Sequence, residues 1–261
     1  MMNRDDGFEQ QVEDENYFVS MTDMMVGLVF IFIILIMYYA LQLQQVRDVF
    51  QNTTEQLTSA NQTRTEILHD IQDRLRRQGL KVEIDTRNGV LRLPDEVLFD
   101  SAKAEVKPAG VVALHKLGLA LEAILPCYTD RPSGLQGPAN CKPSQHRIES
   151  LFIEGHTDKD KLASGGRFKD NWDLSAERAT NTYRQLISQY PDLTTLCLQH
   201  TRGACVPIFS VSGYGDQRPV VTGDSLEAKA RNRRIDLRIL MQTPHASEAQ
   251  EALRIRLGEE Q

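Results

Sequence analysis

The chain has 261 residues, with 30 Lys and Arg against 36 Asp and Glu and a net charge of −6. This balance excludes the basic surface that direct binding to nucleic acid requires, so no nucleic-acid partner is expected. The length leaves room for one globular domain beside a membrane segment, because about 180 residues are enough for a buried core.

An uncharged, proline-free run extends from Met24 to Leu41. As a helix rising about 1.5 Å per residue, it covers about 27 Å, close to the hydrocarbon core of a bilayer. We expect a membrane-spanning helix over residues 17–43. Residues 1–16 hold one Arg among six acidic residues, unlike the basic start of a cleavable signal peptide. The expected arrangement is therefore a lasting anchor that follows a short acidic tail.

Asp23 lies at the edge of this apolar run. A carboxylate costs about 2.5–3.5 kcal/mol at the bilayer centre and less near an end, so it is usually retained for a function. One interpretation is an ion or proton site that faces a partner helix. The other is a helix N-cap, together with Ser20 and Thr22. Position alone supports the two equally.

Residues 44–79 contain apolar residues at roughly helical spacing and no Pro or Gly before Gly79. The pattern predicts a helical stalk that continues out of the membrane, about 55 Å long if Leu41 to Arg77 is fully helical. Its apolar stripe is thin between Gln51 and Glu66. The stalk therefore either pairs as a weak parallel coiled coil or is partly flexible.

From residue 80 onward the pattern predicts an α/β domain that ends at residue 243. A hairpin over 80–93, with its turn at Arg87 to Gly89, opens it. Helices and strands then alternate, which indicates an α/β sandwich with helices on one face of a mixed sheet. The expected elements are a helix over 108–125, a strand over 148–154, a helix over 174–190, a strand over 207–212, a short helix over 225–230 and a strand over 235–241. Residues 244–261 form a polar tail, with a terminal helix over 247–257.

All four cysteines, Cys127, Cys141, Cys197 and Cys205, follow the apolar run. Their spacings lack the CxxC pairs of a zinc site, and an even number suggests two disulfides. Local pairing, Cys127 with Cys141 and Cys197 with Cys205, would close two loops. Three connectivities are possible, and four buried free thiols are the alternative. If the disulfides form, this part of the chain lies in the periplasm.

The six histidines do not stand in an HExxH pattern, and neither paired carboxylates nor a nucleophile elbow accompanies them. We therefore expect no enzyme active site, no metal site and no cofactor.

A group of polar residues marks the expected ligand site. Asp158 follows the end of a predicted strand, and Asn171 and Arg178 open the next helix. An Asp can hold an ammonium group while an Arg binds a carboxylate through two hydrogen bonds, with the Asn orienting either group. The ligand described by these residues is zwitterionic. The alternative is that Asp158 and Arg178 only pair with each other.

Four motifs occur in order along this part of the chain: FIEGHTD, NxxLSAERA, SGYGDQRP and ARNRRIDL. Together they resemble the OmpA-like peptidoglycan-binding domain over about residues 80–241. The resemblance implies that Asp158 binds the amine of the peptidoglycan diamino acid and that Arg178 binds its carboxylate. It implies further site residues at Thr157, Asn171 and Arg234. The connection before Asn171, KDKLASGGRFKD, is longer than the family's, so the rim of the pocket should differ.

The span, stalk and domain together resemble the MotB family of stator subunits. The amino-acid sequence around the span is most similar to the stator-like B subunits of Zorya anti-phage systems. The resemblance implies a single-pass protein of the bacterial inner membrane, with a cytoplasmic N-terminus and a periplasmic C-terminal domain. It implies that Asp23 accepts a proton. The implied partners are peptidoglycan, a second copy of this chain, and a ring of five MotA-like or ZorA-like multi-span channel subunits.

The expected function is therefore that of a peptidoglycan-anchored, stator-like subunit of a proton-driven motor in anti-phage defence. A flagellar stator subunit is one alternative. A structural tether between membrane and cell wall, without ion conduction, is the other.

Overall fold

The computed structural model describes residues 6–131, 141, 144–162, 166–199 and 204–243, with side chains described from residue 21 onward. The chain divides into two compact units, one of residues 1–55 with 244–261 and one of residues 56–243. The terminal helix expected over 247–257 lies outside the described residues.

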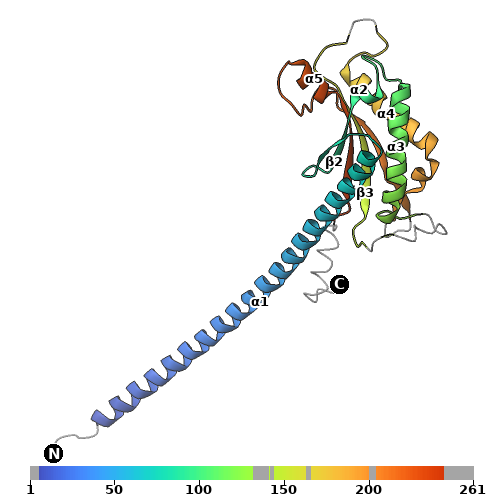
Figure 1. The fold of residues 1–261 in the computed structure, drawn as a ribbon. Coiled ribbons are helices and arrows are strands. Elements are labelled where there is room, and N and C mark those ends of the chain that lie inside the picture. Colours follow the sequence, from blue (N-terminus) through green and yellow to red (C-terminus); the bar gives the residue numbers. More distant parts are fainter. Residues whose placement is uncertain (1–5, 132–140, 142–143, 163–165, 200–203, 244–261) are drawn as a thin grey trace, which may run out of the picture. The chain divides into compact units, whose positions relative to one another are not determined.

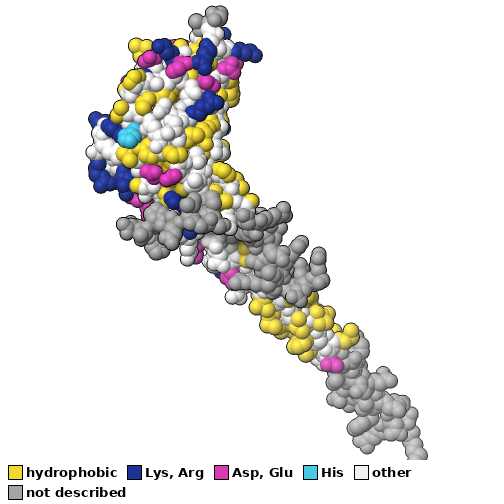
Figure 2. Space-filling model, turned by 90° about the vertical axis from the view of Figure 1, so that its right-hand side faces the viewer, with side chains coloured by type: hydrophobic (Ala, Val, Ile, Leu, Met, Phe, Trp, Pro, Cys, Tyr) yellow, Lys and Arg dark blue, Asp and Glu magenta, His cyan; other side chains and the backbone are white. Residues whose placement is uncertain are grey.

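Helix α1 extends from Asp6 to Arg77 (Figure 1). Residues 21–44 of this helix are all exposed, and Figure 2 shows hydrophobic side chains gathered along this stretch. Its most apolar window has a mean hydropathy of 2.7, which meets the length and composition of a membrane span. A second helix passes the same test, but it is largely buried and belongs to the core of the larger unit.

The start of α1 contradicts the interpretation of Asp23 as a helix cap. Because the helix begins at Asp6, Asp23 lies within it, where its side chain cannot cap the N-terminus. At the other end, Gly79 adopts a φ of +77°. The Leu80 N–H donates to the Leu75 carbonyl at 2.9 Å and the Gly79 N–H to the Arg76 carbonyl at 3.0 Å, which is a Schellman motif.

The larger unit contains a five-stranded mixed sheet in the order β1-β2-β7-β3-β6. Only β3 and β6 are parallel to each other; the other neighbours are antiparallel. The bounds are β1 Glu83–Asp85, β2 Val90–Pro94, β3 Ile148–His156, β6 Phe209–Gly213 and β7 Arg234–Met241. The predicted hairpin and the three later strands are therefore confirmed, with shifts of a few residues at their ends.

Helices α3 (Pro108–Ile124) and α4 (Asn171–Gln189) cover one face of this sheet (Figure 1). Both were predicted, and α4 begins three residues earlier than expected because Asp170 caps it by accepting the Asp173 N–H at 3.0 Å. The expected α/β sandwich is confirmed. The other helices among the described residues are α2 (Asp95–Leu98), α5 (Leu226–Asn232) and two 3₁₀ turns, Leu125–Cys127 and Pro191–Thr195.

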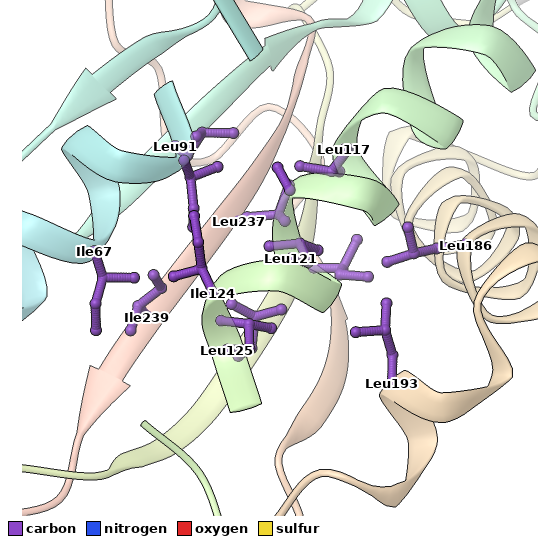
Figure 3. Packing of buried hydrophobic residues seen from close by; sticks show 14 of the residues in the cluster. Ile67, Leu91, Leu117, Leu121, Ile124, Leu125, Leu186, Leu193, Leu237 and Ile239 are labelled. Carbon is purple, nitrogen blue, oxygen red and sulfur yellow. The ribbon is translucent and has the colours of Figure 1, made fainter. Parts of the chain in front are cut away.

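Residues alternate between the two faces of strand β7, as a pleated strand requires. Ile235, Leu237 and Ile239 are buried in the hydrophobic core beneath the helices, and Figure 3 shows Leu237 and Ile239 close to side chains from α3. The last turns of α1 contribute Ile67, Leu68, Ile71 and Leu75 to the same core. The compact unit therefore begins upstream of the boundary expected at residue 80.

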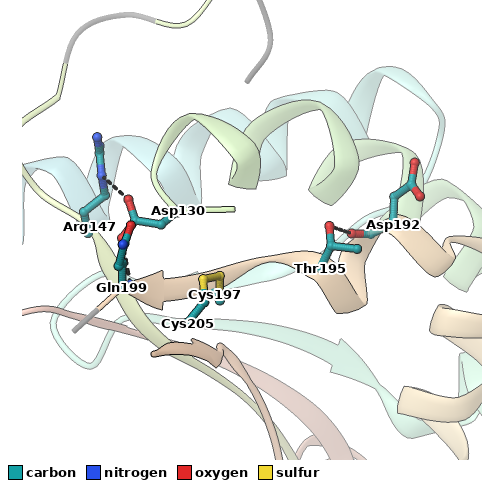
Figure 4. Close-up of a disulfide and its surroundings, with 7 residues drawn as sticks. All are labelled: Asp130, Arg147, Asp192, Thr195, Cys197, Gln199 and Cys205. Carbon is teal, nitrogen blue, oxygen red and sulfur yellow. Dashed lines mark hydrogen bonds and ion pairs between the residues drawn. A yellow bond between two sulfur atoms is a disulfide. The ribbon is translucent and has the colours of Figure 1, made fainter. Parts of the chain in front are cut away.

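Two disulfides join Cys127 to Cys141 and Cys197 to Cys205, the local pairing that the sequence suggested. The second one crosses a small hairpin that was not predicted, formed by β4 (Cys197–Gln199) and β5 (Cys205–Pro207). Asp130 connects this hairpin to the rest of the domain through hydrogen bonds (Figure 4). Its backbone exchanges two hydrogen bonds with Cys197, and its carboxylate accepts the Gln199 N–H at 2.9 Å.

Candidate functional site

Close packing between helix α4 and two strand ends positions the candidate site. A Cβ atom at Gly155 in β3 would overlap the backbone carbonyl of Ser175, and one at Gly213 in β6 would lie 2.5 Å from the Ala176 nitrogen. Only glycine allows the helix to approach so closely. The first two turns of α4 therefore lie against the ends of β3 and β6, close to Asp158, which follows β3.

Asp158 pairs with Arg233. The Arg233 Nη1 lies 2.7 Å from Asp158 Oδ2, while Asp158 Oδ1 accepts the backbone N–H of Asp160 at 3.1 Å. The side-chain amide of Asn171 donates to the backbone carbonyls of Asp158 and Asp160, each at 3.1 Å. Asn171 thus fixes the backbone of Asp158 and, through it, the position of the Asp158 carboxylate.

Arg178 pairs with Asp95, in the short helix α2. The two side chains lie 3.0 Å apart, Nη1 to Oδ2, and both are almost wholly buried. Arg178 Nε also donates to the Lys103 carbonyl at 2.7 Å, and Nη2 donates to the Asp100 carbonyl at 3.3 Å. Three acceptors therefore hold this guanidinium in one orientation. A fixed orientation favours binding of a ligand carboxylate through two hydrogen bonds.

The two ion pairs form one electrostatic group. Burial raises the pKa of Asp95 to about 6, although Arg178 and Arg233 oppose that rise. Burial lowers the pKa of Arg178, and Asp95 and Asp158 counteract the shift. The alternative that Asp158 and Arg178 pair with each other is contradicted, because each has another partner. Two negative and two positive groups thus lie close enough to influence one another, which suits a ligand that carries both charges.

Thr157 and Arg234, the other two expected site residues, lie outside this pair of ion pairs. Thr157 is buried, and its N–H donates to the Gly215 carbonyl at 2.9 Å. Arg234 is turned to the face of the sheet opposite the helices, where its guanidinium contacts Asp236 at 3.0 Å and two backbone carbonyls at 3.1 Å. The structure does not bring Arg234 to Asp158; its neighbour Arg233 takes that place.

Asp95 and Arg233 are the two site residues that sequence reasoning missed. Arg233 is the C-cap of α5 and Arg234 begins β7, so adjacent arginines point to different surroundings. Asp95 follows directly after strand β2. An acidic residue between the end of a strand and an apolar segment was the sequence feature that could have identified Asp95 as a site residue.

A second buried charged group lies on the face of the sheet opposite the helices. Possible ligand atoms of Glu154, His156 and Asp236 lie within 4.8 Å of one another, a spacing that could suit a metal ion. However, Arg238 contacts both oxygens of Glu154 at 2.9 and 2.8 Å, and Arg234 holds Asp236. Burial and these arginines lower the pKa of His156 to about 3. A divalent cation would add positive charge to a group already neutralised by arginines, so we assign no metal there.

Asp23 belongs to the other compact unit. Its side chain is exposed on α1, at the edge of the apolar run. A Cβ atom added at Gly27, one turn further along the helix, would meet nothing within 4 Å. This surface is therefore open to a neighbouring helix.

Comparison with known proteins places the domain. The OmpA family matches residues 139–233. Motility protein B of Bacillus subtilis is 25% identical over 170 residues, 65% of this chain and 52% of that protein. Zorya protein ZorB of Escherichia coli is 24% identical over 239 residues, 87% of this chain and 89% of that protein. The chain spans only about half the length of the first curated relatives, from 52% to 58%.

Among solved structures, a putative MotB-like protein from Desulfovibrio vulgaris has a TM-score of 0.50 and 21% identity. The match covers 72% of this chain and 98% of that one, and it shows a shared fold. Together the comparisons support a MotB-like protein with an OmpA-like domain, similar to ZorB.

Proposed function

We propose that this protein is a stator-like subunit of a proton-driven complex in the bacterial inner membrane, anchored to peptidoglycan and acting in anti-phage defence. The observation that carries the proposal is the reach of the similarity to ZorB. At 87% of the chain, this similarity extends beyond the OmpA-like domain into helix α1. The similarity therefore includes both the apolar helix and the OmpA-like domain, in the same order along the chain.

The anchoring step is the binding of a peptidoglycan diamino acid. Asp158 would accept hydrogen bonds from its ammonium group, and Arg178 would donate to its carboxylate. Asn171 supports Asp158 through the backbone. The ion pair with Asp95 holds Arg178 in one orientation. A ligand with both charges would gain from each half of the group, whereas a simple amine or a simple acid would gain from one half only.

The driving step is the protonation and deprotonation of Asp23. Each elementary charge that crosses the membrane is worth about 2.3 kcal/mol per 100 mV, enough to drive a conformational cycle. An ionised Asp23 needs polar partners, which we assign to a multi-span channel subunit, with two copies of this chain inside a ring of five. The N-terminus would face the cytoplasm and the domain the periplasm, where disulfides persist.

Cosedimentation with purified peptidoglycan sacculi tests the anchor. Full-length protein in detergent should sediment with the sacculi, and Asp158→Ala should remain in the supernatant. Asp160→Ala is the matched control, because that neighbouring carboxylate is exposed and contacts Lys229 at 2.7 Å. Sedimentation of Asp158→Ala at the wild-type level, with its fold intact by circular dichroism, would contradict the assigned site.

Proton flux through the complex with its multi-span partner tests the driving step. Asp23→Asn should copurify with the partner but lose proton flux and phage protection. Asp48→Asn removes an exposed carboxylate of the same helix beyond the apolar run, and it should conduct normally. Full conduction and protection in Asp23→Asn would contradict the assignment of Asp23 as the proton carrier.

The match to Motility protein B favours a second candidate, a flagellar stator subunit. The mechanism is shared, and the target differs. Restored swimming in a strain that lacks its own stator would support this candidate. Protection from phage plaques without restored swimming would support the defence role.

A further inference from the structure

We propose that Arg233 is a resident counter-ion that occupies the ammonium position at Asp158 and that the ligand must displace it. This inference rests on the proposed wall-binding function and adds a competitor within the same site.

The geometry of Asp158 leaves one carboxylate oxygen for a ligand. Oδ1 already accepts the Asp160 N–H, and Oδ2 lies 2.7 Å from Arg233 Nη1. The Asp158 side chain is only 14% exposed, and a carboxylate so poorly solvated needs a cation beside it. A ligand ammonium group that approaches Oδ2 therefore competes with the guanidinium for the space and the negative charge beside this oxygen.

Arg233 is held much more loosely than the other arginine of the site. Among the described residues its guanidinium donates only to Asp158, and its side chain is 34% exposed. Arg178 is 2% exposed and has three acceptors. The Arg233 backbone is fixed, because its N–H donates to the Lys229 carbonyl at 3.0 Å at the end of α5. The side chain can therefore move while the backbone stays in place.

A cavity beside α5 offers the displaced side chain a destination. It has a volume of about 180 Å³, and Arg233 itself lines it. The other charged residues that line it are Glu83, Glu96, Glu227, Arg92, Arg231 and Arg234. Arg231 lies 3.4 Å from Glu83, so we assign Glu96 and Glu227 as the acceptors for the displaced guanidinium. A guanidinium that leaves Asp158 would thus find other acceptors near by, which keeps the exchange from burying an unpaired charge.

Competition of this kind would sharpen selectivity. A simple amine would replace one ion pair by another of similar strength and gain little. A zwitterionic diamino acid adds the contact between its carboxylate and Arg178, which offsets the loss of the Arg233 pair. The site would then reject free amines while binding the wall ligand.

Titration with a soluble muropeptide that contains the diamino acid tests the proposal in the full-length chain in detergent. Trp172 is the single tryptophan, it neighbours Asn171 and is 48% exposed, so its fluorescence reports on binding. Arg233→Gln should bind about 2- to 5-fold more tightly than wild type, within the range expected for removing a partly exposed ion pair. The matched control Arg184→Gln removes the same charge from an exposed position on α4 and should bind within about twofold of wild type.

Equal or weaker binding by Arg233→Gln, with an unchanged circular dichroism spectrum, would overturn the proposal, because a displaced competitor cannot help binding. The double variant Glu96→Gln with Glu227→Gln should bind more weakly than wild type, since the displaced guanidinium would lose two acceptors. If neither wild type nor Arg233→Gln binds the muropeptide, the proposed function and this inference fall together. If wild type binds and Arg233→Gln gains nothing, only the inference falls.

Discussion

The guanidinium of Arg178 lies 3.0 Å from the carboxylate of Asp95, and the two side chains are only 2% and 5% exposed. This pair joins helix α4 to the segment that follows strand β2, two parts of the chain far apart in sequence. Arg178 also binds the carbonyls of Asp100 and Lys103. The residue assigned to the ligand carboxylate therefore also helps to hold the fold together.

Removing one member of this pair should destabilise the domain strongly. Asp95→Ala leaves a buried guanidinium without its charge partner, and we expect the free energy of unfolding to fall by about 3–5 kcal/mol. Urea denaturation of the full-length protein in detergent measures the loss. Asp100→Asn is the control: its carboxylate makes an exposed pair with Lys103, so a change within about 0.5 kcal/mol is expected. Equal losses in the two variants would show that the buried pair contributes no more to the free energy of unfolding than the exposed pair does.

The last turns of α1 should be required for the domain to fold. A fragment that begins at residue 80 lacks Ile67, Leu68, Ile71 and Leu75, all buried in the core. Each such loss is worth about 2–5 kcal/mol, so the sum exceeds the usual stability of a domain. We expect residues 56–243 to unfold cooperatively and residues 80–243 to unfold without cooperativity or to aggregate. A stable, cooperative fragment 80–243 would refute this.

Gly155 should not tolerate a side chain. The added Cβ of Gly155→Ala would overlap the Ser175 carbonyl and push α4 away from β3. We expect a loss of about 3 kcal/mol or more in the free energy of unfolding, together with weaker wall binding because Asn171 shifts with the helix. Gly27→Ala, whose Cβ meets nothing within 4 Å, should leave the domain's unfolding unchanged. Normal stability of Gly155→Ala would mean that the two elements are not in firm contact.

Acid should weaken the domain through His156. Its pKa is about 3 in the folded state, because burial and nearby arginines oppose the charged form, against about 6.5 when unfolded. Below about pH 6.5 the unfolded chain gains a proton that the folded one does not take up, so stability falls as the pH falls towards 3. Asp95 acts in the opposite sense between about pH 4 and 6, since its pKa is raised to about 6.

Comparing variants separates the two contributions. Wild type should lose more stability between pH 7 and pH 4 than His156→Gln, measured by urea denaturation at each pH. Parallel losses in the two proteins would show that His156 is not the group responsible.

Much of the fold could be predicted because its elements have clear periods. Strand β7 alternates apolar and charged residues, and the run from Met24 to Leu41 has the length of a membrane span. Strands β4 and β5 escaped prediction because each has three residues, too few to show a period, and no Asn-Gly turn marks their hairpin as one marks that of β1 and β2. The buried stripe at the end of α1 was visible, but the surface it packs on is formed by residues distant in sequence.

The candidate site could be predicted only in part. Asp158 and Arg178 were identified by residue type and position, yet their partners, Arg233 and Asp95, follow from tertiary packing. Arg233 and Arg234 are adjacent and identical in chemistry. Which of them reaches Asp158 depends on where α5 ends and β7 begins. The spacing of apolar residues does not locate such a boundary to a single residue.

Recognition of a ligand that carries both charges is the central claim, and one calorimetric titration tests it most directly. The full-length protein is titrated with a muropeptide that contains the diamino acid, and then with the same muropeptide after acetylation of the free amine. We predict that acetylation weakens binding by at least about 5-fold, because the uncharged, bulkier amide can neither replace Arg233 at Asp158 nor donate a charged hydrogen bond there. Equal affinity for the two muropeptides would contradict the assignment of Asp158 as the ammonium-binding residue.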